Sequence, residues 1–148
     1  MTADADGTIA IGYQAGQSIT TGQSNTAIGY QALMVATGSD RNTAIGYQAL
    51  TVASASDGAA SNTAVGYYAG AAITTGVSNT AIGSQALDAV TTGDYNTAVG
   101  HYALTSVSGD NNYNTALGYS AGYGIVAGTG NVAIGHKSAE NTGGTHNY

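Results

Sequence analysis

One nine-residue segment recurs along the whole chain. The letters NTAIGYQAL stand at 25–33 and again at 42–50, and weaker copies continue to the C-terminus. A short period that fills a chain marks a repeat architecture, in which each unit is stable only when it is stacked on its neighbours. We therefore expect residues 1–148 to form a single repeat domain of eight coils, about 17 residues each. The coils are keyed on one glycine column: Gly12, Gly29, Gly46, Gly66, Gly83, Gly100, Gly118 and Gly135.

The residues around each glycine are typical of a β-strand. Glycine interrupts every apolar segment and β-branched residues dominate, which disfavours a helix. A second glycine follows about ten residues later in each copy and marks a turn. The fold class that this pattern predicts is all-β, a parallel β-solenoid. The aliphatic residues before the turns are enough for a second short strand in each copy: Ile19, Val35, Val52, Ile73, Val90, Val107 and Ile125 or Val126.

Alternation along the strand separates two kinds of side chain. In the segment T-A-I-G-Y, the Thr, Ile and Tyr side chains point to one side, and the Ala and Gly residues face the other. We assign the aliphatic column before the glycines to the core. Its members are Ile11, Ile28, Ile45, Val65, Ile82, Val99, Leu117 and Ile134. The alanine column lies two residues before the glycines, from Ala10 to Ala133. Because glycine within a strand often marks a close approach, we expect another layer or another chain against this bare face.

The small size of the hydrophobic residues predicts self-association. The chain has no Trp or Phe, so a single coil encloses few apolar atoms. Ordering costs about 1.5 kcal/mol per residue, which favours further burial against a second copy. The candidate self-association residues are Ala27, Gly29, Ala44, Gly46, Ala81, Gly83, Ala98, Gly100, Tyr13, Tyr30, Tyr47, Tyr67 and Tyr119. These tyrosines could instead offer aromatic groups to a glycan, but packing against a neighbouring chain is favoured because Tyr is enriched at interfaces.

A column of asparagines precedes the strands. Stacked Asn side chains hydrogen-bond along themselves in parallel β arrays, so a structural ladder is expected. The asparagine column is Asn25, Asn42, Asn62, Asn79, Asn96, Asn114 and Asn131.

A longer period of three coils is superimposed on the short one. Copies one, four and seven replace Leu by Gly, at Gly16, Gly70 and Gly122. Copies three and six carry longer turns, near Asp57 and near 110–113. We expect these two loops to lie on the same edge of the rod.

Composition excludes several classes of partner. The chain has two Lys or Arg residues against eight Asp or Glu residues and a formal charge of −6. It therefore cannot neutralise a phosphate backbone, and nucleic acid is not expected as a partner. No apolar segment reaches 18 residues, so membrane insertion is not expected either.

No motif in the sequence predicts catalysis. The three histidines, His101, His136 and His146, do not fall at the spacing of a triad or a zinc cluster, and we expect surface positions. Asp40, Asp57, Asp94 and Asp110 lie in or beside Gly turns, where turn chemistry accounts for them. No Gly-rich phosphate loop with its Lys is present. We expect no enzyme, no cofactor and no metal site, apart from a weak ion at the turn edge as an open alternative.

The repeat resembles a known family. The pattern N-[TV]-A-[IVL]-G, present as NTAIG, NTAVG, NTALG and NVAIG, resembles the head repeats of trimeric autotransporter adhesins. The string NTAIGYQAL with a following TTG is similar to repeat arrays in phage tail-fibre-type proteins and large bacterial surface proteins. The resemblance covers 7–147 and implies a left-handed β-roll, with three chains packed around one axis. It also implies a non-enzymatic adhesive shaft or head, located outside the cell, on the cell surface or on a virion, which contacts a glycan or protein receptor.

Two other functions stay open. Residues 145–148 reach the Asn position of a ninth copy, and Thr8 stands at that position in the first. Coils of different copies could therefore stack end to end in an extracellular filament. An ice-binding solenoid is the minor alternative, because the Thr residues three before the glycines form only a single column.

Overall fold

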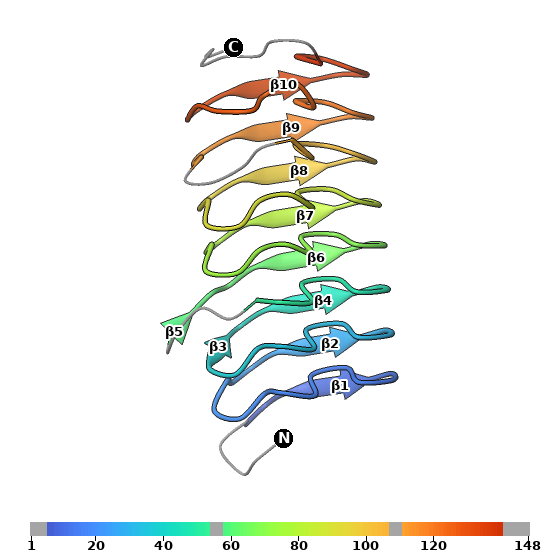
Figure 1. Ribbon diagram of the computed structural model, residues 1–148, viewed down its shortest axis with the longest axis vertical. Helices are drawn as coiled ribbons and strands as arrows, with labels where there is room; N and C mark the ends of the chain where they lie inside the picture. Colours follow the sequence, from blue (N-terminus) through green and yellow to red (C-terminus); the bar gives the residue numbers. More distant parts are fainter. Residues whose placement is uncertain (1–5, 54–57, 107–110, 141–148) are drawn as a thin grey trace.

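The computed structural model describes residues 6–53, 58–106 and 111–140 as a rod of stacked coils (Figure 1). Eight parallel strands of three residues form one sheet along the rod. Two shorter strands, β3 (Ser39–Asp40) and β5 (Gly58–Ala59), pair with each other outside it. The eight strands, in spatial order, are β1 (Ile9–Ile11), β2 (Thr26–Ile28), β4 (Thr43–Ile45), β6 (Thr63–Val65), β7 (Thr80–Ile82), β8 (Thr97–Val99), β9 (Thr115–Leu117) and β10 (Val132–Ile134).

Identical positions of the repeat lie beside one another in the sheet. The register of β2 and β4 pairs Thr26 with Thr43 and Ala27 with Ala44, and every other pair of neighbours keeps the same alignment. Each strand therefore pairs only with the strands of the preceding and following copies. The predicted parallel β-solenoid of coils about 17 residues apart is confirmed.

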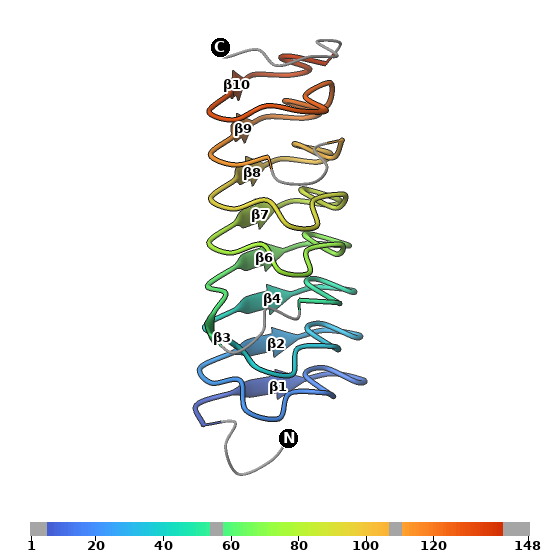
Figure 2. The ribbon, with the colours of Figure 1, turned by 60° about the vertical axis from the view of Figure 1, so that its left-hand side comes forward.

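The predicted second strand of each coil is wrong. In the described part of the chain, none of the aliphatic residues predicted for it lies in a strand, and β3 and β5 lie nearer the glycine turns (Figure 2). The chain turns before it reaches these residues, because Gln31 and Leu33 adopt φ angles of 53° and 51°, which an extended strand does not have. The turns still stack, since the Gln31 N–H donates to the Tyr13 carbonyl at 2.8 Å and the Leu33 N–H donates to the Ala49 carbonyl at 3.0 Å. Val107 lies outside the described residues.

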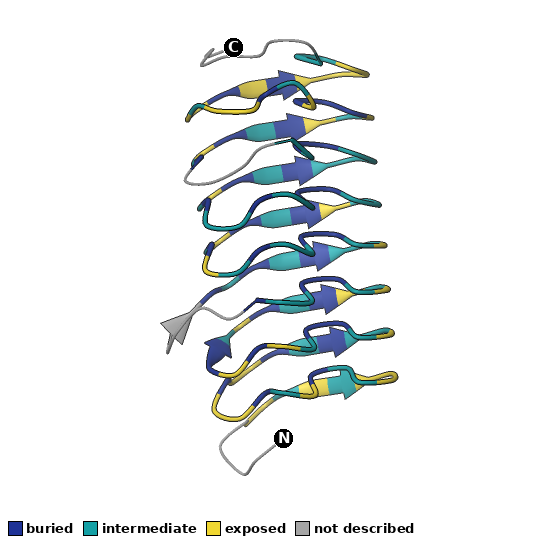
Figure 3. Cartoon of the chain, viewed as in Figure 1, coloured by how far each residue is buried: buried dark blue, intermediate teal, exposed yellow. Residues whose placement is uncertain are grey.

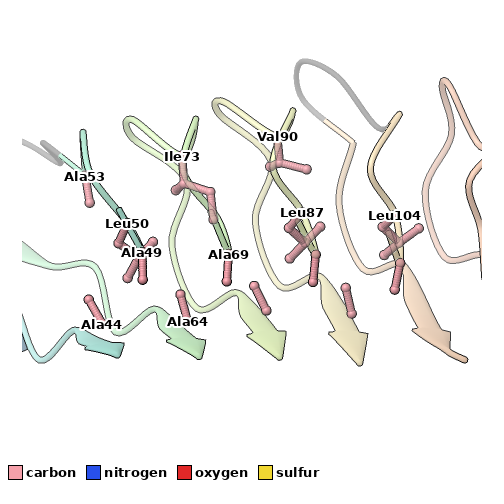
Figure 4. Close-up of a cluster of buried hydrophobic side chains, with 14 of the residues drawn as sticks. Ala44, Ala49, Leu50, Ala53, Ala64, Ala69, Ile73, Leu87, Val90 and Leu104 are labelled. Carbon is pink, nitrogen blue, oxygen red and sulfur yellow. The ribbon is translucent and has the colours of Figure 1, made fainter. Parts of the chain in front are cut away.

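The core lies on the alanine side of the sheet, which corrects the assignment of the aliphatic column. Ala27 and Ala44 are fully buried, whereas Ile11 is 59% exposed and Ile134 is 64% exposed (Figure 3). The space between the sheet and the turns is narrow. It holds one small side chain from the strand opposite one larger side chain from the turn, as Ala44 lies opposite Leu50 in Figure 4. An Ile in place of the alanine would overfill this space.

The three-coil period follows from how each coil fills its interior. Coils that carry Leu33, Leu50 or Leu87 have a buried residue smaller than Ile three positions later, namely Ala36, Ala53 or Val90. Coils that carry Gly at the Leu position have a buried Ile three positions later. The pairs of that second type are Gly16 with Ile19, Gly70 with Ile73 and Gly122 with Ile125.

The asparagine column forms the predicted ladder and is buried throughout. The Asn42 backbone N–H donates to the Asn25 Oδ1 at 2.9 Å, and the Asn42 Nδ2 donates to the same atom at 3.2 Å. The Asn25 Nδ2 also donates to the Ser39 carbonyl at 2.7 Å, which ties the strand to the turn before the next coil. Buried polar groups are costly when unpaired, so this ladder fixes the spacing of the coils.

The glycine column allows the coils to approach one another. Gly83 has a φ of +132°, and a Cβ added there would lie 2.6 Å from the Gly100 carbonyl oxygen. Both the backbone conformation and the lack of space require glycine at this position. The close approach that the glycines indicated is therefore to the next coil of the same chain.

Candidate association surface

The outward face of the sheet carries two apolar columns side by side. One is the aliphatic column, and the other is the aromatic column, which lies one residue after the glycines. We define the aromatic column as Tyr13, Tyr30, Tyr47, Tyr67, Ser84, His101, Tyr119 and His136. All five tyrosines in it are exposed, from 41% at Tyr30 to 63% at Tyr13. The structure therefore places the five candidate tyrosines together on one surface of the rod, as the sequence predicted.

The rings of the aromatic column stack along the rod. The ring centroids of Tyr13 and Tyr30 are 5.2 Å apart, those of Tyr30 and Tyr47 are 5.0 Å apart, and those of Tyr47 and Tyr67 are 5.4 Å apart. This spacing follows from the separation of neighbouring strands, about 4.8 Å. Parallel strands in register therefore present a continuous aromatic surface over the first four coils.

The stack is interrupted at Ser84 and then resumes with histidines. His101 stacks on Tyr119 with ring centroids 5.4 Å apart, and His136 lies 5.4 Å from Tyr119 on the other side. The ring of His101 also packs edge to face on the ring of Tyr102, with ring centroids 3.9 Å apart. The His101 Nδ1 atom is buried and has no hydrogen-bond partner among the described residues. Both histidines continue the ladder, His136 as an exposed residue and His101 as a half-buried one. His146 lies outside the described residues.

A ladder of glutamines runs beside the tyrosines of the first three coils. The Gln31 Nε2 donates to the Gln14 Oε1 at 2.7 Å, and the Gln48 Nε2 donates to the Gln31 Oε1 at 2.6 Å. In the fourth coil Tyr68 takes this position and its ring contacts the rings of Tyr47 and Tyr67. Desolvation, followed by the proximity of these two tyrosines, raises the pKa of Tyr68.

The alanines proposed for self-association are not available to a partner, and that prediction is wrong. Each of them is fully buried inside a single chain, and the four glycines of the same set are half-buried against the next coil. The face with small residues is the interior of the coil, because the larger side chains there come from the turns. The corrected alanines are Ala27, Ala44, Ala81 and Ala98, and the glycines are Gly29, Gly46, Gly83 and Gly100.

The aliphatic column is the part of the surface that the sequence reasoning missed. Ile45, Ile82 and Leu117 are 36%, 40% and 49% exposed. A signal for this was present in the pattern itself. The position two before the glycine admits only alanine, whereas the position before the glycine admits Ile, Val or Leu. Strict restriction to one small residue is typical of the more crowded side of a strand.

The acidic residues of the turns act on the backbone. Asp40 Oδ1 accepts a hydrogen bond from the Gln23 N–H at 2.8 Å, and Asp94 Oδ1 accepts one from the Val77 N–H at 2.8 Å. This bears out the turn role predicted for both. Asp57 and Asp110 lie outside the described residues. Within the ranges that the structure describes, no three His, Cys, Asp or Glu residues come together as metal ligands, and no helix could span a membrane.

Asp88 differs from the other acidic residues. Its Oδ2 accepts a hydrogen bond of 3.3 Å from the Gln85 Nε2, while its Oδ1 is buried without a partner among the described residues. Desolvation by burial raises the pKa of this carboxyl, and the Gln85 hydrogen bond opposes that effect. Asp88 therefore lowers the stability of the coil when it is ionised.

Comparisons of the chain with protein-family models, with curated proteins and with solved structures gave no match. The function must therefore be argued from the surface itself.

Proposed function

We propose that this protein is a non-enzymatic fibre module whose rods associate side by side through the outward face of the sheet. The observation that carries the proposal is the pair of columns, aliphatic and aromatic, whose members are exposed or half-buried along the described rod. Two such columns side by side form a surface at the upper end of the apolar patches that soluble monomers expose, and large patches mark sites of association. Neither column contains a carboxylate, Lys or Arg, so no fixed charge must be desolvated on contact.

The dimensions of the face suit a stable contact. Strands about 4.8 Å apart make the eight-stranded sheet about 38 Å tall. Across the rod, each coil contributes five consecutive positions to this face, from the residue three before the glycine to the member of the aromatic column. These five positions span about 16 Å along the strand. The resulting area, about 600 Å², is at the lower edge of what one partner buries in a standard interface. Tyr supplies much of this area, and Tyr is enriched in interface cores.

Three copies are the number that we propose for the assembly. The support is the resemblance of the NTAIG-type repeats to the head repeats of trimeric autotransporter adhesins, in which three chains pack around one axis. Closed threefold symmetry would cover the outward face of every copy and leave the turn side in solvent. By the same resemblance, the module is a rigid shaft or head on a cell surface or virion, and its external partner is a glycan or protein receptor.

Small-angle X-ray scattering tests the side-by-side contact, because the mass per unit length does not depend on how long the particle is. A single rod has 14.5 kDa in about 38 Å, and we expect three times this mass per length. The Ile45→Lys/Ile82→Lys variant should return to the single-rod value, because the two ammonium groups cannot be buried without a partner.

The matched control is Val35→Lys/Val126→Lys, which places the same charges at exposed positions outside the sheet. It should keep the wild-type mass per length. A wild-type protein with the mass per length of one rod would contradict the proposal.

A further inference from the structure

The two end coils of the described rod carry backbone groups that have no partner among the described residues. Between inner coils, the N–H of the glycine column donates to the carbonyl of the preceding coil, as Gly29 does to Ile11 at 2.8 Å. In the first coil, the corresponding N–H groups of Gly12 and Gln14 have no acceptor among the described residues. In the last coil, the carbonyls of Ile134 and His136 likewise have no donor among them.

The asparagine ladder ends on an unsatisfied acceptor. In each inner coil the Asn Oδ1 accepts the backbone N–H of the Asn in the following coil, and the last such bond is from Asn131 to Asn114 at 3.0 Å. The Asn131 Oδ1 is itself buried and has no partner among the described residues. At the other end of the ladder Thr8 occupies the Asn position, and its N–H has no acceptor within the described ranges.

The last member of the glycine column differs from the other seven in its surroundings. A Cβ added at any of the other seven members of the glycine column would collide with backbone of the next glycine. A Cβ added at Gly135 would meet no described atom within 4 Å. Among the described residues, none fills the space at this end that a further coil fills elsewhere in the rod.

We propose that the protein polymerises head to tail, with the first coil of one copy stacked on the last coil of another. The joint repeats the contacts between inner coils. Thr8 N–H donates to Asn131 Oδ1, Gly12 N–H donates to the Ile134 carbonyl, and Gln14 N–H donates to the His136 carbonyl. The occupant of each end is thus a second copy of this chain.

The register of the rod favours one direction of growth. Head-to-tail stacking keeps the strands of the two copies parallel and aligned as in the inner coils, so these groups meet the same kinds of partner as inside the rod. Head-to-head stacking would continue neither the parallel register nor the asparagine ladder. A head-to-tail contact is heterologous and does not close. Residues 145–148, on which the sequence argument for stacking partly depended, lie outside the described residues. The inference depends on the first and last described coils and does not require the side-by-side contact.

Particle length measured by electron microscopy tests the joint. We expect wild-type particles many rods long. Gly135→Ala should reduce them to the length of one rod, because the added methyl group would face the carbonyl of Gly12 in the next copy. The control is Gly130→Ala, which also places alanine at a positive φ in the last coil, in a column where other coils carry Ser, Arg or Tyr. It should leave the length unchanged.

The two proposals fail in distinguishable ways. Gly135→Ala should shorten the particles and leave the mass per length unchanged, whereas Ile45→Lys/Ile82→Lys should reduce the mass per length and leave the length unchanged. Thermal unfolding of the Gly135→Ala variant establishes that it is folded. Wild-type particles of single-rod length at all concentrations would overturn the head-to-tail joint whatever their thickness.

Disulfide crosslinking tests the register of the joint in a chain that has no cysteine of its own. In the Tyr13→Cys/His136→Cys variant, the two positions become neighbours in the aromatic column across the joint, about 4.8 Å apart, which suits a disulfide. Oxidation should give a ladder of covalent polymers. Tyr13→Cys/Tyr119→Cys places the thiols two coils apart, about 9.6 Å, and should give no ladder. Closed covalent dimers alone in the first variant would indicate antiparallel side-by-side contact and overturn the joint.

Discussion

Ile73 occupies the space that a side chain at Gly70 would need. A Cβ added to Gly70 would lie 3.0 Å from the Ile73 Cδ1 and 3.1 Å from the Leu50 Cδ2. The side chain of Ile73 therefore fills the interior of one coil, whereas the side chain of Leu50 fills the interior of the neighbouring coil. In the coils that carry Gly at the Leu position, this position and the Ile position three residues later therefore share one volume.

The shared volume predicts a compensating pair of substitutions. Gly70→Leu alone overfills the coil and should destabilise it by about 1–3 kcal/mol. Ile73→Ala alone leaves a cavity and should cost about 2–5 kcal/mol. The double variant recreates the Leu50 and Ala53 arrangement, and its free energy of unfolding should lie close to that of the wild type. Urea unfolding measures all three, and additive losses in the double variant would contradict the shared volume.

Substitution within the asparagine ladder should weaken the rod strongly. Asn79→Leu removes the donor to the Gly93 carbonyl, at 2.7 Å, and the acceptor of the Asn96 N–H, at 2.9 Å. Each buried group left unpaired costs about 1–3 kcal/mol, so we expect a loss of several kcal/mol in urea unfolding. Thr80→Val, at the neighbouring and partly exposed position, is the control and should change stability by less than about 1 kcal/mol. Equal effects of the two would show that the ladder does not fix the coils.

The glycine column should tolerate no branched side chain inside the rod. Gly83→Val combines an unfavourable φ with a Cβ 2.6 Å from the Gly100 carbonyl oxygen, so we expect the coils to separate and cooperative thermal unfolding to be lost. Asp94→Asn keeps the Oδ1 that accepts the Val77 N–H and should unfold close to the wild-type temperature. A folded Gly83→Val protein with the wild-type midpoint would mean that neighbouring coils are not in close contact there.

The raised pKa of Asp88 predicts a pH dependence of stability with a defined sign. Between the unfolded and the folded pKa of this group, the folded state binds more protons, so stability falls as pH rises through that interval. Asp88→Asn has no ionisable carboxyl and therefore removes this loss of stability at higher pH. The thermal midpoint of the variant should exceed that of the wild type at pH 7, and the difference should be smaller at pH 3. A difference that does not change with pH would indicate that the carboxyl is not desolvated.

The repeat predicted the stacking better than it predicted which side faces inward. Gly46 and Asn42 could be assigned from the sequence because each depends on a neighbour at a fixed spacing, and spacing is what a repeat displays. The exposure of Ile45 could not be predicted from the sequence, because hydrophobicity alone favours burial. The coil interior is too narrow for this side chain, and that narrowness depends on the conformation of the turn. In that turn Gln48 and Leu50 have φ values of 51° and 47°, a conformation that Gln and Leu rarely adopt and that the sequence therefore does not predict.

The direction of the hydrogen bonds between coils determines how the rod responds to a pulling force. These bonds run along the rod axis, so the interfaces between coils carry tension one after another, while the bonds within one interface share it. Under tension applied at the two termini, the coils should detach singly. Each coil adds about 4.8 Å to the folded rod, but its 17 residues extend to about 58 Å when unravelled. The rod can therefore lengthen roughly twelvefold in discrete steps before the covalent chain is loaded, and every detached coil leaves a template on which it can fold back.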